Sequence, residues 1–111
     1  MPDRAQLTRA AERLISGHIE SVGALDLLLL LHDRRDRDWS LDELCRELRC
    51  PEAWAEGEIR RLRRLELVAP VGDGRYHYRR GRRHGPAVDE IARACRRNRA
   101  EVTRLIFARS A

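Results

Sequence analysis

Residues 40–48, which read SLDELCREL, carry the clearest helix-start signal in the chain. The Ser40 side chain can accept a hydrogen bond from the backbone N–H of Glu43, while the Glu43 side chain reaches back to the backbone N–H of Ser40. This reciprocal pair is a capping box. We expect the helix to be short, because Pro51 disfavours helical backbone geometry at Cys50. The stretch therefore predicts a short, well-capped helix that buries one apolar face.

A longer helix is predicted directly after it, over residues 51–66, because proline suits the first turn of a helix. Steps of 100° per residue divide this helix into two faces. The face predicted to pack inward carries Trp54, Ala55, Ile59, Leu62 and Leu65. The face predicted to point outward carries Ala53, Glu56, Gly57, Arg60 and Arg64. We expect this second set to face whatever the domain binds.

Strand-like alternation follows this helix. Residues 67–71 and 75–79 flank a Gly-Asp-Gly turn at residues 72–74, and two short runs on either side of such a turn predict a β-hairpin. Pro70 cannot donate a hydrogen bond to a neighbouring strand, which favours an edge strand. Residues 80–86, which read RGRRHGP, are predicted to form a basic, flexible connector.

Helices are also predicted on both sides of this segment. Residues 4–16 form an amphipathic stripe, and residues 21–32 contain five consecutive leucines, which indicate a central helix that is covered on several sides. A last helix is expected over about residues 87–108, where apolar side chains recur every seven residues. Asn98 occupies one position of this seam, where it either fixes the register of a helix pair or is simply exposed. The seam predicts a homodimer interface formed by Val88, Ile91, Cys95, Val102 and Leu105.

The order of a helix, a short capped helix, a turn, a second helix and a basic hairpin resembles the winged helix-turn-helix of bacterial transcriptional regulators. The resemblance is to the broad MarR, ArsR and PadR-like groups and covers residues 21–80. It rests on residues 40–48, on IRRLRRLELV at residues 59–68 and on the turn at residues 72–74. Glu66 stands where those groups usually carry a glycine before the wing, so the chain is assigned to no single group.

The resemblance also implies how the chain is organised. The expected fold class is mainly α with a small β-hairpin wing, and the length of 111 residues suits a single domain. In such regulators the helices that flank the winged domain form the dimer interface. The expected parts are an N-terminal helix in residues 1–20, the winged domain in 21–80, a basic linker in 81–86 and a C-terminal helix in 87–111.

The resemblance implies binding to double-stranded DNA, and the charge distribution supports it. Residues 59–83 carry nine arginines against Glu66 and Asp73, a net charge of +7, and such a basic block is attracted to a polyanion. Arg60 and Arg64 are the candidates for the major groove, because a guanidinium can bind guanine with two hydrogen bonds. The candidates for phosphate contacts are Arg75, His77, Arg79, Arg80, Arg82 and Arg83.

Three glutamates at the start of the same helix support a different interpretation. Glu52, Glu56 and Glu58 lie in the half that usually contacts bases, where carboxylates repel phosphate. They can also simply favour the helix N-terminus through the helix dipole. The alternative function is a winged-helix adapter that binds a protein partner through residues 51–66 and does not read DNA sequence.

Enzymes and secreted or membrane proteins find little support in the sequence. It shows no phosphate-binding glycine loop and no recognisable nucleophile motif, so we expect no enzyme. The N-terminus has no signal-peptide core, and the longest apolar run is too short to span a bilayer. A cytoplasmic protein without membrane contact is therefore expected.

The cysteines and histidines are the candidate metal ligands of the chain. Three cysteines without CxxC spacing predict no disulfide framework. Cys45 and Cys50, with His32 and His84, could together bind a metal, but Cys45 lies on the apolar stripe of its helix and is expected in the core. We therefore expect no metal and no cofactor.

Overall fold

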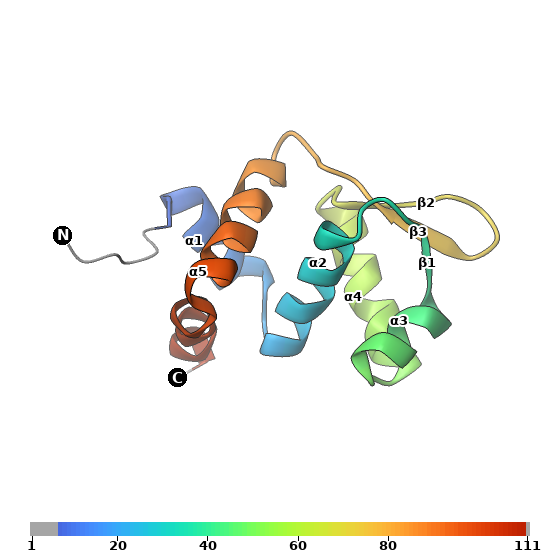
Figure 1. The fold of residues 1–111 in the computed structure, drawn as a ribbon, viewed down its shortest axis with the longest axis horizontal. Helices are drawn as coiled ribbons and strands as arrows, with labels where there is room; N and C mark the ends of the chain where they lie inside the picture. Colours follow the sequence, from blue (N-terminus) through green and yellow to red (C-terminus); the bar gives the residue numbers. More distant parts are fainter. Residues whose placement is uncertain (1–6, 111) are drawn as a thin grey trace.

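The structure is a computed structural model that describes residues 7–110, with side chains described through residue 108. Its elements are α1 (Arg9–His18), α2 (Val22–Asp33), β1 (Trp39–Ser40), α3 (Leu41–Leu48), α4 (Glu52–Arg64), β2 (Val68–Pro70), β3 (Arg75–Tyr78) and α5 (Gly85–Ser110). The expectation of a mainly helical chain with a small β-hairpin is confirmed. Figure 1 shows α1 and α5 side by side at one end, α2 in the middle, and α3, α4 and the sheet at the other end.

The core forms around α2, as the run of leucines predicts. α5, α3 and β3 all contact this helix. The α2 side chains with 0–1% exposure are Leu25, Leu27, Leu28 and Leu31. Burying a side chain of this size contributes roughly 1.5–3 kcal/mol relative to leaving it in water. The same core continues into the sheet through Trp39 and Tyr78, so the helices and the hairpin form one packed unit.

The sheet has three antiparallel strands in the order β1-β3-β2. The predicted hairpin is confirmed, with Pro70 opposite Tyr76 and Pro70 in an edge strand. The expectation of only two strands is wrong, because Trp39 and Ser40 pair with the other side of β3. A strand of two residues shows no alternation that a sequence pattern could detect. Its pairing depends instead on burial of the Trp39 ring, which is 3% exposed.

The first helix differs at both ends from its predicted range of residues 4–16. It begins at Arg9, after Thr8 caps it by accepting a hydrogen bond from Ala11, and residues 4–6 lie outside the described residues. Gly17 and His18 continue the helix, although they were expected to interrupt it. The Thr8 hydroxyl also donates to Glu90 over 2.7 Å, which ties the start of α1 to α5.

The last helix is broken at Asn98, which has a non-helical backbone (φ −159°, ψ 89°). The halves on either side of this kink both pack inward, because Val88, Ile91 and Val102 have 0% exposure within the single chain. These positions of the predicted dimer seam are thus occupied by the chain's own core. Cys95 is half-buried against the same core, and Leu105 is 37% exposed.

Candidate nucleic-acid interface

The turn between α3 and α4 is held by local hydrogen bonds that the sequence predicts. Ser40 accepts from the backbone N–H of Glu43 over 3.1 Å, and Glu43 accepts from the backbone N–H of Ser40 over 2.9 Å. α3 ends where Arg49 adopts the left-handed conformation (φ 54°). Pro51 then precedes α4 as its N-cap, one residue before its predicted place in the first turn. These contacts fix the direction in which α4 leaves α3.

The two faces of α4 are confirmed. Ala55, Ile59 and Leu62 are buried, while Trp54 and Leu65 are half-buried beside them. On the opposite face Ala53, Glu56, Arg60 and Arg64 are exposed and Gly57 is half-buried. The helix therefore presents one continuous face to solvent.

The arginines of this face lie in its C-terminal half. Arg60 contacts Glu56 only at 3.8 Å across one helical turn. Arg64 and the neighbouring Arg63 are exposed, and no carboxylate of residues 7–108 pairs with either. Arg63 was not among the predicted contacts, because it lies between the two arcs on a helical wheel. Arg61 is different: its guanidinium binds Glu20 at 2.7 Å and so joins α4 to the start of α2.

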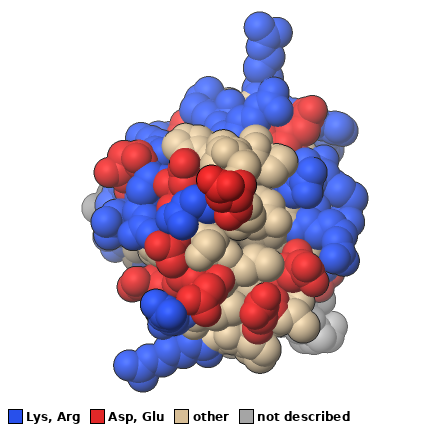
Figure 2. Space-filling view, turned by 90° about the vertical axis from the view of Figure 1, so that its right-hand side faces the viewer, with Lys and Arg blue, Asp and Glu red and all other residues tan. Residues whose placement is uncertain are grey.

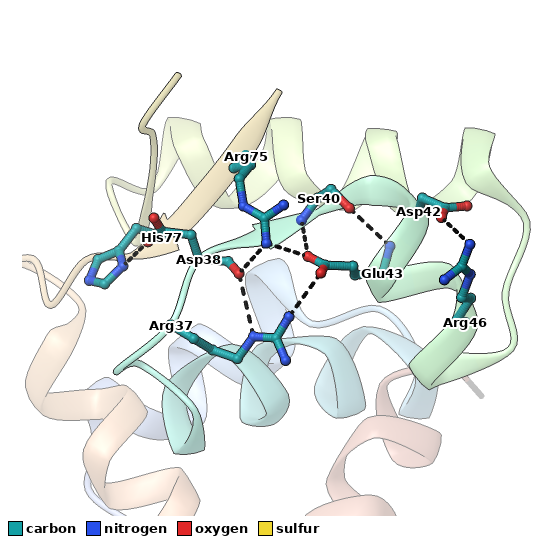
Figure 3. Close-up of polar contacts among 8 residues, drawn as sticks. All are labelled: Arg37, Asp38, Ser40, Asp42, Glu43, Arg46, Arg75 and His77. Carbon is teal, nitrogen blue, oxygen red and sulfur yellow. Dashed lines mark hydrogen bonds and ion pairs between the residues drawn. The ribbon is translucent and has the colours of Figure 1, made fainter. Parts of the chain in front are cut away.

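Two of the predicted phosphate contacts are engaged inside the chain (Figure 3). The Arg75 guanidinium donates to Glu43 Oε1 over 2.7 Å and to the Asp38 carbonyl oxygen over 3.2 Å. His77 Nδ1 lies 2.7 Å from Asp38 Oδ1. In this conformation both side chains are paired with residues that lie beside β3, the central strand of the sheet. Their role as DNA contacts stays a prediction.

Arg80 is also paired, whereas the arginines around it are not. Arg80 Nε donates to Asp89 Oδ2 over 2.8 Å. The pKa of Asp89 is lowered, because burial, which raises it, is outweighed by hydrogen bonds from Arg80 and His32. Arg79, Arg82 and Arg83 are exposed, and within the described side chains no carboxylate pairs with them.

Backbone contacts bring these unpaired arginines to the C-terminal end of α4. The Arg79 N–H donates to the Leu67 carbonyl oxygen over 2.7 Å. Gly81 packs so closely on Glu66 that a Cβ at that position would lie 2.9 Å from the Glu66 carbonyl oxygen. These contacts place the segment that follows β3 beside the C-terminal end of α4. We call the exposed arginines of these two segments that have no carboxylate partner among the described side chains the basic cluster: Arg63, Arg64, Arg79, Arg82 and Arg83.

The exposed side chains at the beginning of α4 are acidic, in contrast to those at its end. Figure 2, which looks at the face of the hairpin, α3 and α4, shows red and blue side chains interspersed around a tan centre. Glu52 and Glu56 are exposed on the first turns of α4. Glu58 is half-buried, and burial raises its pKa, with Arg61 lowering it and Glu20 raising it further. The surface is thus divided between an acidic beginning and a basic end of α4.

A cavity of about 380 Å³ lies beside the acidic half. It sits between the start of α2 and the α3–α4 turn, and its walls include Leu48, Pro51 and Trp54. The Trp54 ring also lies against Gly23 of α2, where an added Cβ would be 3.3 Å from it. The Trp54 side chain therefore packs against α2 and also forms part of the cavity wall.

The four side chains weighed as metal ligands do not converge. His32 is buried between Asp33 and Asp89, with each ring nitrogen 3.0 Å from a carboxylate oxygen. His84 lies against His18, with the ring centroids 5.9 Å apart. In the described part of the chain no three histidine, cysteine or acidic side chains gather as a metal site would require. Cys45 and Cys50 are half-buried and lie next to each other, a pairing that the sequence analysis missed.

Comparison with known proteins adds no relative. No family model, no curated protein and no solved structure matches the chain. None of the helices described between residues 7 and 110 has the length and apolar character needed to cross a bilayer. The function must therefore be argued from the geometry of the chain itself.

Proposed function

We propose that the chain is a winged-helix protein that binds double-stranded DNA and acts as a transcriptional regulator. The observation that carries the proposal is the basic cluster, whose five exposed arginines have no carboxylate partner among the described side chains and come from the C-terminal end of α4 and from the segment packed beside it. Phosphate contacts of this kind supply most of the affinity of a DNA-binding protein and make it depend on salt. The α3–turn–α4 arrangement beside an antiparallel hairpin supplies the helix that a major groove accepts.

The division of charge indicates how α4 would approach a duplex. Its acidic beginning repels phosphate, so the helix would enter the groove with its C-terminal half. Arg60 and Arg64 would then face base edges, and the remaining arginines of the basic cluster would lie on phosphates. The predicted contacts Arg75, His77 and Arg80 fall outside this interface unless their carboxylate partners are released.

A pair of matched double variants tests the proposal. We expect Arg82→Gln with Arg83→Gln to weaken duplex binding and to reduce the slope of log K against log salt by about 2, since each phosphate contact contributes about 0.9. The control is Arg97→Gln with Arg104→Gln on α5, which removes the same charge from the other part of the molecule. Fluorescence anisotropy at two salt concentrations measures both. Equal losses in the two variants would show that only net charge matters and would overturn the interface.

A protein-binding adapter is the second candidate, and the cavity beside the acidic half of α4 favours it. Gly57 discriminates between the two functions, because a Cβ added at this position meets nothing within 4 Å. We therefore expect a substitution there to preserve the fold. Under the DNA proposal Gly57→Arg adds a positive charge near the groove and strengthens duplex binding. Under the adapter function the same bulky charge blocks the presented face, so a partner retained by the wild-type protein is lost.

A homodimer remains part of the proposal, on a smaller surface than the sequence predicted. With Val88, Ile91 and Val102 inside the chain, the apolar surface that α5 leaves exposed includes Leu105 and Phe107, the latter 62% exposed. Phe107→Ser is expected to shift a dimer toward monomer in sedimentation at tens of micromolar. If the wild-type protein is already a monomer under these conditions, the dimer is refuted. The DNA-binding proposal does not depend on this result.

A further inference from the structure

Cys45 and Cys50 meet at the point where α3 ends. Arg49 has a positive φ, and the N–H groups of Arg49 and Cys50 both donate to the Cys45 carbonyl oxygen, the latter over 3.2 Å. The Cys50 bond is the six-to-one bond of a Schellman motif, and the Arg49 bond is the five-to-one bond of a left-handed helix cap. At such helix ends the side chains at the positions of Cys45 and Cys50 frequently make an apolar contact. Here both side chains are thiols, and they are close enough for Cys45 to raise the pKa of Cys50.

The two thiols differ in access. Cys50 lines the cavity of about 380 Å³ beside α4, and Arg49 lies on the same wall. Cys45 lies on α3 and is half-buried, and it is not among the residues that line this cavity. Cys95 is on α5 and packs against the core elsewhere. Of the three cysteines, only Cys45 and Cys50 are therefore brought together by the backbone hydrogen bonds of a single turn.

We propose that Cys45 and Cys50 form a reversible intramolecular disulfide by exchange with a small-molecule disulfide that enters through the cavity. The site is a modification site in the turn between α3 and α4. It does not depend on the DNA-binding proposal, since the bond can be detected without any duplex.

The exchange balances in two steps. The Cys50 thiolate attacks one sulfur of the small disulfide, breaks its S–S bond, forms a mixed disulfide and releases one thiolate. Cys45 then loses its proton, attacks Cys50 Sγ, forms the intramolecular S–S bond and releases the second thiolate. Both released thiolates take up the protons that the cysteines lost. Two electrons pass from the protein thiols to the small disulfide, so no further oxidant is needed.

The surroundings of the thiols determine the rate. Burial raises the pKa of the Cys50 thiol, and the neighbouring Cys45 raises it further. Because the thiolate is the attacking species, the exchange should accelerate as the pH rises toward the pKa of Cys50. The cavity wall carries Arg49 and also Asp26, which is paired with Arg99 on α5. The positive charge of Arg49 therefore favours an anionic disulfide such as oxidised glutathione.

Mass spectrometry of the full chain tests the proposal, with Cys95→Ser as the starting variant. After incubation with oxidised glutathione we expect the monomer to lose two hydrogens without retaining glutathione, and a reduced thiol to restore the original mass. Added to this background, Cys45→Ser should stop the reaction at one glutathione on Cys50. The variant that combines Cys95→Ser with Cys50→Ser should react far more slowly, because its remaining thiol, that of Cys45, does not line the cavity.

Three outcomes would overturn the proposal. One is stable glutathione adducts on Cys45 and Cys50 together, which would show that the thiols cannot reach each other. Another is a disulfide between two chains in place of the intramolecular bond. The third is a rate that does not rise with pH between about 7 and 9, where the thiolate fraction of an ordinary cysteine increases.

Discussion

The Arg75 guanidinium lies 2.7 Å from Glu43 Oε1, so the hairpin is joined to the capped start of α3 (Figure 3). The same carboxylate accepts from the Ser40 N–H and pairs with Arg37 at 3.2 Å. The pKa of Glu43 is lowered, first by the Ser40 backbone hydrogen bond and then by the charges of Arg75 and Arg37, which together outweigh the effect of burial. One acidic side chain therefore caps a helix and neutralises two arginines.

Replacing Glu43 by glutamine is expected to strengthen duplex binding. Glutamine can still complete the capping box, but it no longer holds Arg75 and Arg37 by charge. If the released arginines reach phosphate, affinity should rise roughly three- to tenfold at low salt, with a steeper salt dependence. The control is Glu101→Gln, which makes the same charge change beside Arg104 on α5. Anisotropy titrations that give the same gain for both variants would contradict the prediction.

The place of Arg75 shows why the site was harder to predict than the fold. The helices follow from signals within a few residues, such as the Ser40–Glu43 box and the apolar spacing on α4. The pairing of Arg75 with Glu43 joins positions 32 apart in the chain and depends on β1, a strand without a sequence signal. Net charge along the sequence predicts that every cation of the hairpin contacts DNA. The sequence does not reveal that Glu43 pairs with Arg75 and that Asp38 pairs with His77 once β1 has formed.

Glu66 has a φ of 61°, a left-handed conformation that side chains with a Cβ seldom adopt. Holding a residue with a Cβ in this conformation costs roughly 1–2 kcal/mol of stability. Glycine avoids this strain, but part of the gain is lost because glycine has more conformational freedom in the unfolded chain. We expect Glu66→Gly to raise the free energy of unfolding by about 0.5–1 kcal/mol. Glu56→Gly, inside α4, should lower it by about 1 kcal/mol. Urea denaturation of both variants measures the difference, and a destabilised Glu66→Gly would show that this side chain makes a compensating contact.

The backbone at Glu66 also explains the missing glycine of the resemblance. Glycine adopts a positive φ without steric cost, and this chain adopts that conformation here with a glutamate. The Leu67 N–H still donates to the Leu62 carbonyl oxygen over 2.9 Å, so the end of α4 is closed in spite of the substitution.

His84 is expected to make stability depend on pH. Burial lowers its pKa below the usual 6.5, and the neighbouring His18 and Arg83 lower it further. The folded chain then binds a proton on His84 less readily than the unfolded chain, so this stability is fully present above the unfolded pKa and is lost as pH falls through the folded one.

We expect the free energy of unfolding to decrease between about pH 7 and pH 5, and His84→Gln to flatten this part of the curve. His77→Gln serves as the control, because His77 lies beside Asp38 on the hairpin and leaves the environment of His84 unchanged. Urea titrations at several pH values provide the measurement. If the slope persists in His84→Gln and disappears in His77→Gln, then His77 causes the pH dependence and the prediction is wrong.

Asn98 separates the two halves of α5, and its side chain accepts a hydrogen bond from the Glu101 N–H over 3.4 Å. This is the contact of an N-cap, so the second half starts as a new helix at a changed angle. The heptad spacing of Ile91, Asn98 and Leu105 indicated one continuous seam, because a repeat of seven does not reveal a kink. The kink lets Val102 and Ile106 return to the core, where both have 0–1% exposure.

Asn98→Ala should therefore lower the free energy of unfolding by about 1 kcal/mol, the usual cost of losing a side-chain cap. Alanine also favours a continuous helix, which would carry Val102 away from the core and expose apolar surface. Asn98→Asp is the matched control, because a carboxylate still caps the helix. Denaturation compares the stabilities, and sedimentation shows whether the exposed surface drives self-association. If Asn98→Ala and Asn98→Asp unfold at the same urea concentration, the kink is held by packing of Val102 and Ile106 and not by the cap.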